Sequence, residues 1–160
     1  MTIKVGDKLP SLALTTATAE GPKAIDTAEF FAGKKVVLLA LPGAFTPTCS
    51  AKHLPGFLTH YDALKAKGVD AILCLSVNDV FVMDAWRKDQ KADDKVTLVA
   101  DGSAVFTNAV GLSLDLTAKG LGTRSDRYAM IVENGVVKWL AVEAPGAFEA
   151  STAEAVLAAL

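Results

Sequence analysis

The chain contains 160 residues, of which 51% are apolar and 21% are charged, and its formal net charge at pH 7 is −2. This length suits one compact domain, which we expect to span residues 1–160. The apolar content excludes a disordered chain, and the near balance of basic and acidic residues leaves no broad basic field for nucleic acid. We therefore expect no nucleic-acid partner. We also expect no membrane partner, because every apolar run is too short to cross a bilayer.

The first residues, Met1 to Asp7, contain neither an apolar signal region nor an Arg-rich stretch. A cytoplasmic location is therefore expected. In that reducing compartment, Cys49 and Cys74 are each either a buried apolar side chain or a reactive thiol, and two cysteines cannot form a disulfide framework.

Three short apolar runs predict buried strands over residues 36–41, 69–77 and 96–100. The first run stops at Pro42-Gly43. Helices are predicted between the strands, over residues 49–67 and 80–91, and Gly68 is a suitable stop for the first helix.

Near the C-terminus, Asn134-Gly135 separates two apolar runs, 128–133 and 136–142, and predicts a β-hairpin. The segment Ser151 to Glu154 has the pattern of a capping box and predicts the start of a last helix. This order of elements predicts an α/β fold, with a central mixed sheet and helices on both faces. Chemistry is expected beyond the carboxyl ends of the central strands.

Cys49 lies at that edge of the predicted sheet. Pro47 precedes the predicted helix and Thr48 is a candidate N-cap, so Cys49 falls in the first turn. Free backbone N–H groups and the helix dipole favour the thiolate there. Cys49 could instead be an apolar filler, but the flanking Pro42 and Pro47, and a hydroxyl at Thr46, favour a nucleophile.

The pattern Thr46-x-x-Cys49 resembles the C-x-x-C of thioredoxins with the first cysteine replaced by Thr. A disulfide reductase needs that second thiol nearby to resolve its mixed disulfide. The pattern therefore disfavours a thiol reductase and favours a thiolate that attacks a small substrate.

Longer motifs carry a family resemblance. The segments PGAFTPTCS at 42–50, HLPGF at 53–57, SVNDVFVMDAW at 76–86 and RSDRYAMIVENG at 124–135 resemble the type-5 (type II) peroxiredoxins. These are thiol peroxidases with a thioredoxin-like fold. The resemblance implies a catalytic group of Cys49 as peroxidatic cysteine, Thr46 bonding the peroxide, Arg127 stabilising charge and Pro42 shielding the pocket.

Such a reaction needs no metal and no organic cofactor, because the sulfur supplies both electrons and becomes a sulfenic acid. Cys74 occupies the resolving position of some plant relatives, but the pattern places it inside a buried strand, roughly 10 Å below the edge. A disulfide needs Cα atoms within about 7 Å. We therefore expect an external thiol, glutathione with glutaredoxin or else thioredoxin, as the electron donor.

Other candidates have weaker support. Cys49, His53 and Cys74 could form part of a zinc site, but further ligands are missing. His53 and His60 are expected to be polar helix residues, although His53 could tune the thiolate. Arg124 either pairs with a carboxylate and orients the site or is a solvated charge.

The resemblance also implies a homodimer packed through the loops around the site, where Phe45 lines the pocket or lies at the contact. We expect a cytoplasmic peroxidase acting on hydrogen peroxide and small organic hydroperoxides. A redox-sensing or chaperone-like binding protein on the same fold is the alternative.

Overall fold

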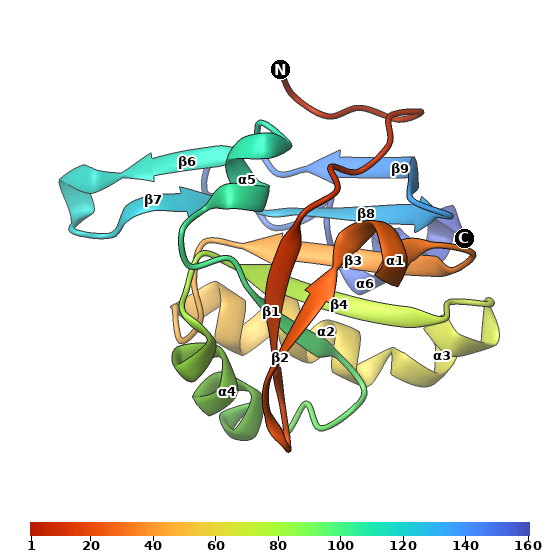
Figure 1. The fold of residues 1–160 in the computed structure, drawn as a ribbon, viewed down its shortest axis with the longest axis horizontal. Helices are drawn as coiled ribbons and strands as arrows, with labels where there is room; N and C mark the ends of the chain where they lie inside the picture. Colours follow the sequence, from red (N-terminus) through yellow and green to blue (C-terminus); the bar gives the residue numbers. More distant parts are fainter.

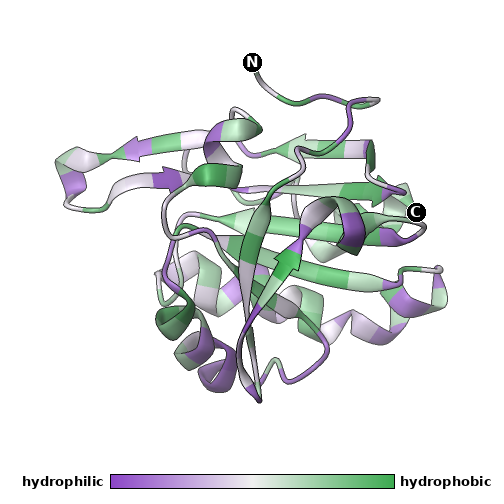
Figure 2. Cartoon of the chain, viewed as in Figure 1, coloured by the Kyte–Doolittle hydropathy of each residue, from purple (hydrophilic) through white to green (hydrophobic).

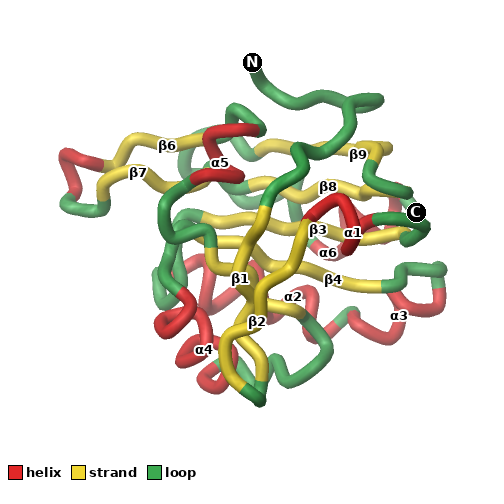
Figure 3. Tube along the Cα trace, viewed as in Figure 1, coloured by secondary structure: helices red, strands yellow, loops and turns green.

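The computed structural model describes residues 1–160 and contains one large sheet with helices on both faces (Figures 1 and 3). Its seven strands run in the order β2 (Gly21–Asp26), β1 (Ala13–Thr18), β5 (Thr97–Ala100), β4 (Ala71–Ser76), β3 (Lys35–Leu41), β8 (Tyr128–Glu133), β9 (Val136–Val142). The central strands β3, β4 and β5 are parallel and all other neighbours are antiparallel. The predicted α/β class with a mixed sheet is confirmed.

Two apolar layers lie against the sheet. One contains buried side chains of α2 (Leu54–Thr59), α3 (Tyr61–Ala66), α4 (Val80–Asp89) and α6 (Ala153–Ala159). The other contains buried side chains of α1 (Thr27–Phe31) and α5 (Val105–Ala109). β3 lies between them, with residues 36–41 all buried, so this strand is apolar on both faces (Figure 2).

A second, two-stranded sheet projects from the body of the molecule (Figure 1). It pairs β6 (Ser113–Leu116) with β7 (Gly122–Ser125) through a short 3₁₀ turn at Thr117–Lys119. The sequence prediction missed this hairpin, together with β1, β2, α1 and α5. These elements are short, and β2, β6 and β7 carry too few apolar residues for a clear period.

The predicted helix over 49–67 is wrong as one continuous element. It consists of a π-helical turn at Cys49–His53 followed by α2 and α3, which are separated at His60. Pro55 has no N–H to continue the helical ladder. His60 leaves helical geometry at φ −94° and ψ 13°, and its ring Nδ1 lies 2.9 Å from the carbonyl oxygen of Gly56.

The predicted capping box at Ser151 is also wrong, because α6 is capped by Thr152, whose side chain accepts from the N–H of Ala155. The Ser151 hydroxyl donates to Glu143 instead. The hairpin at Asn134-Gly135 is confirmed, with both residues at positive φ. No helix has the length and apolar content needed to span a membrane.

Candidate active site

The loop after β3 folds tightly before Cys49. Phe45 has the left-handed φ of 64°. The Thr46 hydroxyl and N–H both donate to the carbonyl of Gly43, at 2.7 and 3.3 Å, and the Thr46 carbonyl accepts from the N–H of Ser50. The Thr46 hydroxyl proton is therefore committed to the backbone, while its lone pairs remain available.

Cys49 begins the π-helical turn, in which the N–H of Leu54 donates to the carbonyl of Cys49. Thr48 occupies the cap position, but it has helical φ and ψ and its side chain caps nothing, which corrects the predicted N-cap. Cys49 and His53 are both fully buried. The turn thus places a thiol and an imidazole in one buried space.

Arg127 joins these two side chains. Its Nη2 donates to the sulfur of Cys49 at 3.1 Å, and its Nη1 donates to Nδ1 of His53 at 2.9 Å. Arg127 lies directly before β8, and its carbonyl accepts from the N–H of Glu143 after β9. The two antiparallel strands therefore fix the backbone from which the guanidinium reaches the sulfur.

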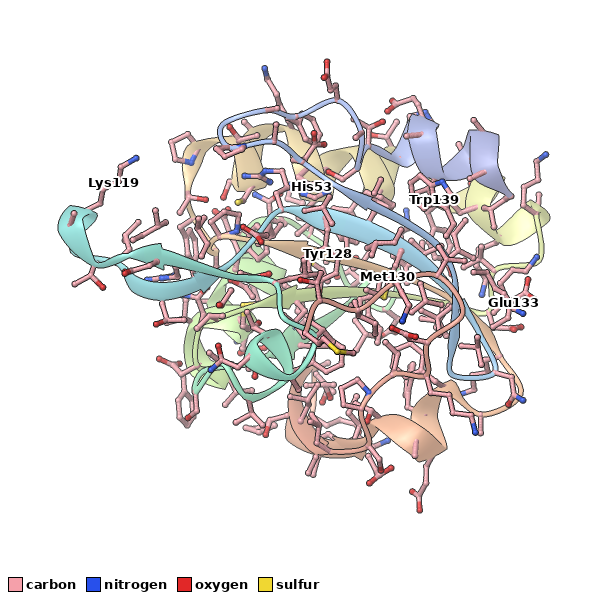
Figure 4. The ribbon with its side chains drawn as sticks, turned by 90° about the horizontal axis from the view of Figure 1, so that it is seen from above. His53, Lys119, Tyr128, Met130, Glu133 and Trp139 are labelled. Carbon is pink, nitrogen blue, oxygen red and sulfur yellow. The ribbon has the colours of Figure 1, made fainter.

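His53 has one further polar contact, in which Nε2 lies 3.0 Å from the carbonyl oxygen of Ser151. Phe57 and Phe148 flank the ring at centroid distances of 5.8 and 5.1 Å. Burial, together with the neighbouring charge of Arg127, lowers the pKa of His53 to about 3. The imidazole is therefore neutral at physiological pH. Figure 4 shows His53 close to the loop that joins β9 and α6.

Glu143 shapes that loop. Its carboxylate accepts from the backbone N–H groups of Glu149, Ala150 and Ser151 and from the Ser151 hydroxyl, at 2.7–3.1 Å. Burial raises the pKa of Glu143, but these hydrogen bonds outweigh it and hold the pKa below its usual value. Glu143 therefore fixes the segment that presents the Ser151 carbonyl to His53.

A pocket of about 500 Å³ opens next to this group. Its lining includes Pro42, Thr48 and Arg127, together with Leu114 and Leu116 of the β6–β7 hairpin. The sulfur of Cys49 has no exposed surface. Arg127 lines the pocket and donates to the buried sulfur, so this residue connects the pocket to Cys49.

Comparison with known proteins identifies the family. The redoxin family model matches residues 4–157. Among curated proteins, the chain is 51% identical to the chloroplastic Peroxiredoxin-2E of Arabidopsis thaliana, over 99% of this chain and 69% of the relative. It is 46% identical to Peroxiredoxin-2C of the same plant, over 99% of this chain and 98% of the relative. The chain belongs to the peroxiredoxins, within the redoxin family.

Solved structures agree with this assignment. Reduced Prx3 of Vibrio vulnificus in complex with hydrogen peroxide has a TM-score of 0.93 and 53% identity, over 99% of this chain and 96% of that one. This peroxiredoxin is accordingly a thiol-dependent peroxidase with a thioredoxin-like fold.

Of the predicted site residues, Cys49 and Arg127 are in contact, Pro42 lines the pocket, and Thr46 contacts the loop backbone rather than the sulfur. Arg124 is half-buried, and the expected carboxylate partner is wrong. It makes no ion pair, and it donates to the carbonyls of Leu121 and Pro42, at 2.9 and 3.3 Å.

Cys74 lies within β4, hydrogen-bonded between β3 and β5, in the same buried apolar cluster as Cys49. Burial raises the pKa of the Cys74 thiol well above its usual value, and the neighbouring Cys49 raises it further. Both thiols are free. No group of three or more His, Cys, Asp or Glu side chains is placed to hold a metal ion.

The sequence prediction missed Glu143, Phe148 and the carbonyl of Ser151. It named His53 as a polar helix residue that could tune the thiolate, but it did not predict the contact between His53 and Arg127. The one sequence signal for Glu143 is its position: it directly follows β9, which places it at the same edge of the sheet as Arg127.

Proposed function

We propose that Cys49 is the peroxidatic nucleophile of a type-5 peroxiredoxin. The observation that carries the proposal is the hydrogen bond from Arg127 Nη2 to Cys49 Sγ, at 3.1 Å. A guanidinium donor favours the anionic sulfur, because charge-assisted hydrogen bonds are stronger than neutral ones. The motifs around residues 42–57 and 124–135 support the type-5 assignment.

In the proposed reaction the thiolate attacks one peroxide oxygen and the O–O bond breaks. Cys49 becomes a sulfenic acid, and the departing alkoxide or hydroxide takes up a proton to leave as alcohol or water. Negative charge moves from sulfur towards the departing oxygen. Arg127 stabilises that charge from a fixed position, as an oxyanion donor does.

Thr46 and Pro42 have supporting roles in this proposal. Because the Thr46 hydroxyl donates to Gly43, its oxygen accepts a hydrogen bond from the peroxide O–H. Pro42 lines the pocket, and in this role its ring limits the approach of water. Leu114 and Leu116 give the same pocket an apolar side, which suits organic hydroperoxides as well as hydrogen peroxide.

An external thiol completes the proposed cycle. It condenses with the sulfenic acid, releasing water and leaving a mixed disulfide, and a second thiol then frees Cys49. Glutathione with glutaredoxin, or else thioredoxin, suits this step. Cys74 is a poor resolving group because its thiol is buried in mid-strand and disfavours the thiolate form. Such a cycle fits a reducing compartment such as the cytoplasm.

A homodimer is part of the proposal. Three exposed apolar side chains come shortly after the parallel strands: Phe45 after β3, Phe81 after β4 and Val105 after β5. Their exposed fractions are 51%, 75% and 51%. They therefore lie at the carboxyl edge of the parallel strands, near the site. Exposed apolar side chains at one edge favour burial against a second copy.

The decisive experiment replaces the nucleophile. Cys49→Ser should abolish hydroperoxide reduction while circular dichroism stays unchanged, whereas Cys74→Ser should retain activity with an external thiol. Mass spectrometry after one equivalent of peroxide should find the oxidation on Cys49. Full activity in Cys49→Ser would refute the assignment, and a stoichiometric Cys49–Cys74 disulfide would refute external resolution.

A further inference from the structure

His53 is a buried histidine whose two ring nitrogens face partners of opposite kind. The Ser151 carbonyl can only accept a hydrogen bond, so Nε2 must carry the proton. The Arg127 guanidinium can only donate, so Nδ1 must be unprotonated. Both contacts are satisfied only by the neutral ring protonated at Nε2.

Arg127 in turn uses both terminal nitrogens of its guanidinium. Nη1 is held by His53, and Nη2 points at Cys49. Because the guanidinium is planar and rigid, fixing one N–H fixes the direction of the other. The Arg127 Cζ also lies 5.8 Å from the centroid of the Phe148 ring, which limits tilting.

The neutrality of the anchor has a physical consequence. Arg127 makes no ion pair with any carboxylate. A carboxylate in place of His53 would orient the guanidinium but would also compete with the sulfur for its charge. A neutral imidazole orients Arg127 and leaves its full positive charge to act on Cys49.

We propose that His53 is a positioning residue for peroxide reduction: its Nε2–H tautomer, set by the Ser151 carbonyl, holds Arg127 in line with the Cys49 sulfur. Glu143 belongs to the same arrangement, because it fixes the backbone that carries the Ser151 carbonyl. The inference rests on the proposed role of Cys49, and the tests separate the two.

The test compares variants that keep different hydrogen bonds of His53. His53→Asn places an amide oxygen near the Nδ1 position and can still accept from Arg127. His53→Gln reaches towards the Ser151 carbonyl but offers Arg127 no matched acceptor. His53→Phe keeps the ring shape and neither hydrogen bond. His60→Asn, on the same segment and with its own contact to the Gly56 carbonyl, is the control.

We expect His53→Gln and His53→Phe to lower the second-order rate of Cys49 oxidation by hydrogen peroxide roughly 10–100-fold, the range typical of lost outer-shell support. His53→Asn should retain most of the rate, and His60→Asn all of it.

A double-mutant cycle tests whether His53 acts through Arg127. In an Arg127→Gln background, His53→Gln should cause no further loss, because the guanidinium it positions is gone. An undiminished loss in that background, or equal rates for His53→Asn and His53→Gln, would overturn the proposal. Peroxide reduction by Cys49→Ser would instead overturn the proposed function.

Nitrogen chemical shifts give an independent readout that needs no turnover. The Nδ1 of His53 should have the shift of an unprotonated imidazole nitrogen near neutral pH, and Nε2 that of a protonated one. A protonated Nδ1 would contradict the arrangement directly.

Discussion

Replacing Arg127 by Gln isolates the contribution of one positive charge to the chemistry at Cys49. At 3.1 Å and an effective dielectric constant of about 20, a unit charge pair interacts by about 5 kcal/mol, which bounds the gross effect. Arg127 stabilises both the thiolate and the departing oxygen, so only part of this energy lowers the barrier. Loss of one such donor typically costs about 3–4 kcal/mol, or roughly 10²–10³-fold in rate.

Arg127→Lys refines the same prediction. Lysine keeps the charge, but it cannot hold the rigid fork that contacts both Cys49 and His53. Its rate should lie between those of the wild type and Arg127→Gln. In the Gln variant the buried Nδ1 of His53 also loses its donor, which should lower the free energy of unfolding by about 1–3 kcal/mol.

The assay is stopped-flow fluorescence with an intrinsic reporter. Trp86 is buried and its indole N–H donates to the Ser50 hydroxyl at 2.9 Å, one residue from Cys49. Its emission should respond to oxidation of the neighbouring thiol. The reasoning would be refuted if Arg127→Gln, shown to be folded by circular dichroism, reacted with hydrogen peroxide within about threefold of the wild type, a barrier change below about 1 kcal/mol.

Three further outcomes are expected. Cys74→Ala should keep peroxidase activity with glutathione and glutaredoxin. Loss of that activity would mean that Cys74 takes part in the catalytic cycle. Phe45→Glu should shift sedimentation at micromolar concentration from dimer to monomer, and an unshifted dimer would place the contact elsewhere. The unfolding free energy should fall as the pH drops from about 6.5 towards 3, by up to about 1.4 kcal/mol per pH unit, because unfolded His53 takes up a proton that the folded state excludes. His53→Asn should flatten that slope, while an unchanged slope would mean that the folded ring binds the proton.

The parts of the molecule that sequence predicts well are those set by local chemistry. The run 36–41 is apolar at every position and becomes a strand buried on both faces. Asn134-Gly135 satisfies its own turn through two positive φ angles. Cys49 was found because it follows the first of these strands at a predicted helix start, and Arg127 because the motif directly before β8 resembles that of the peroxiredoxins.

The break between Cys49 and Gly68 shows where local reasoning fails. A helical pattern that stops at Gly68 predicted one helix, although Pro55 lies within it and removes one helical hydrogen bond. The structure instead starts with a π-helical turn and changes direction at His60. The turn is supported by its surroundings, since the Ser50 hydroxyl accepts from Trp86 of α4 and His53 bonds the Ser151 carbonyl. These contacts are tertiary, and helical periodicity does not record them.

The contacts that hold His53 in place could not be predicted from the sequence, for a further reason. His53 and Ser151 are separated by 98 residues, and the atom that His53 meets is a backbone carbonyl, which every residue type possesses. No motif can mark such an acceptor. What sequence does encode is Glu143, the carboxylate that gathers the N–H groups preceding α6 and so turns one carbonyl towards the imidazole. Glu143→Gln should therefore lower the rate of peroxide reduction as His53→Gln does. The Glu143 carboxylate itself contacts neither Cys49 nor Arg127, so this effect would act through the loop.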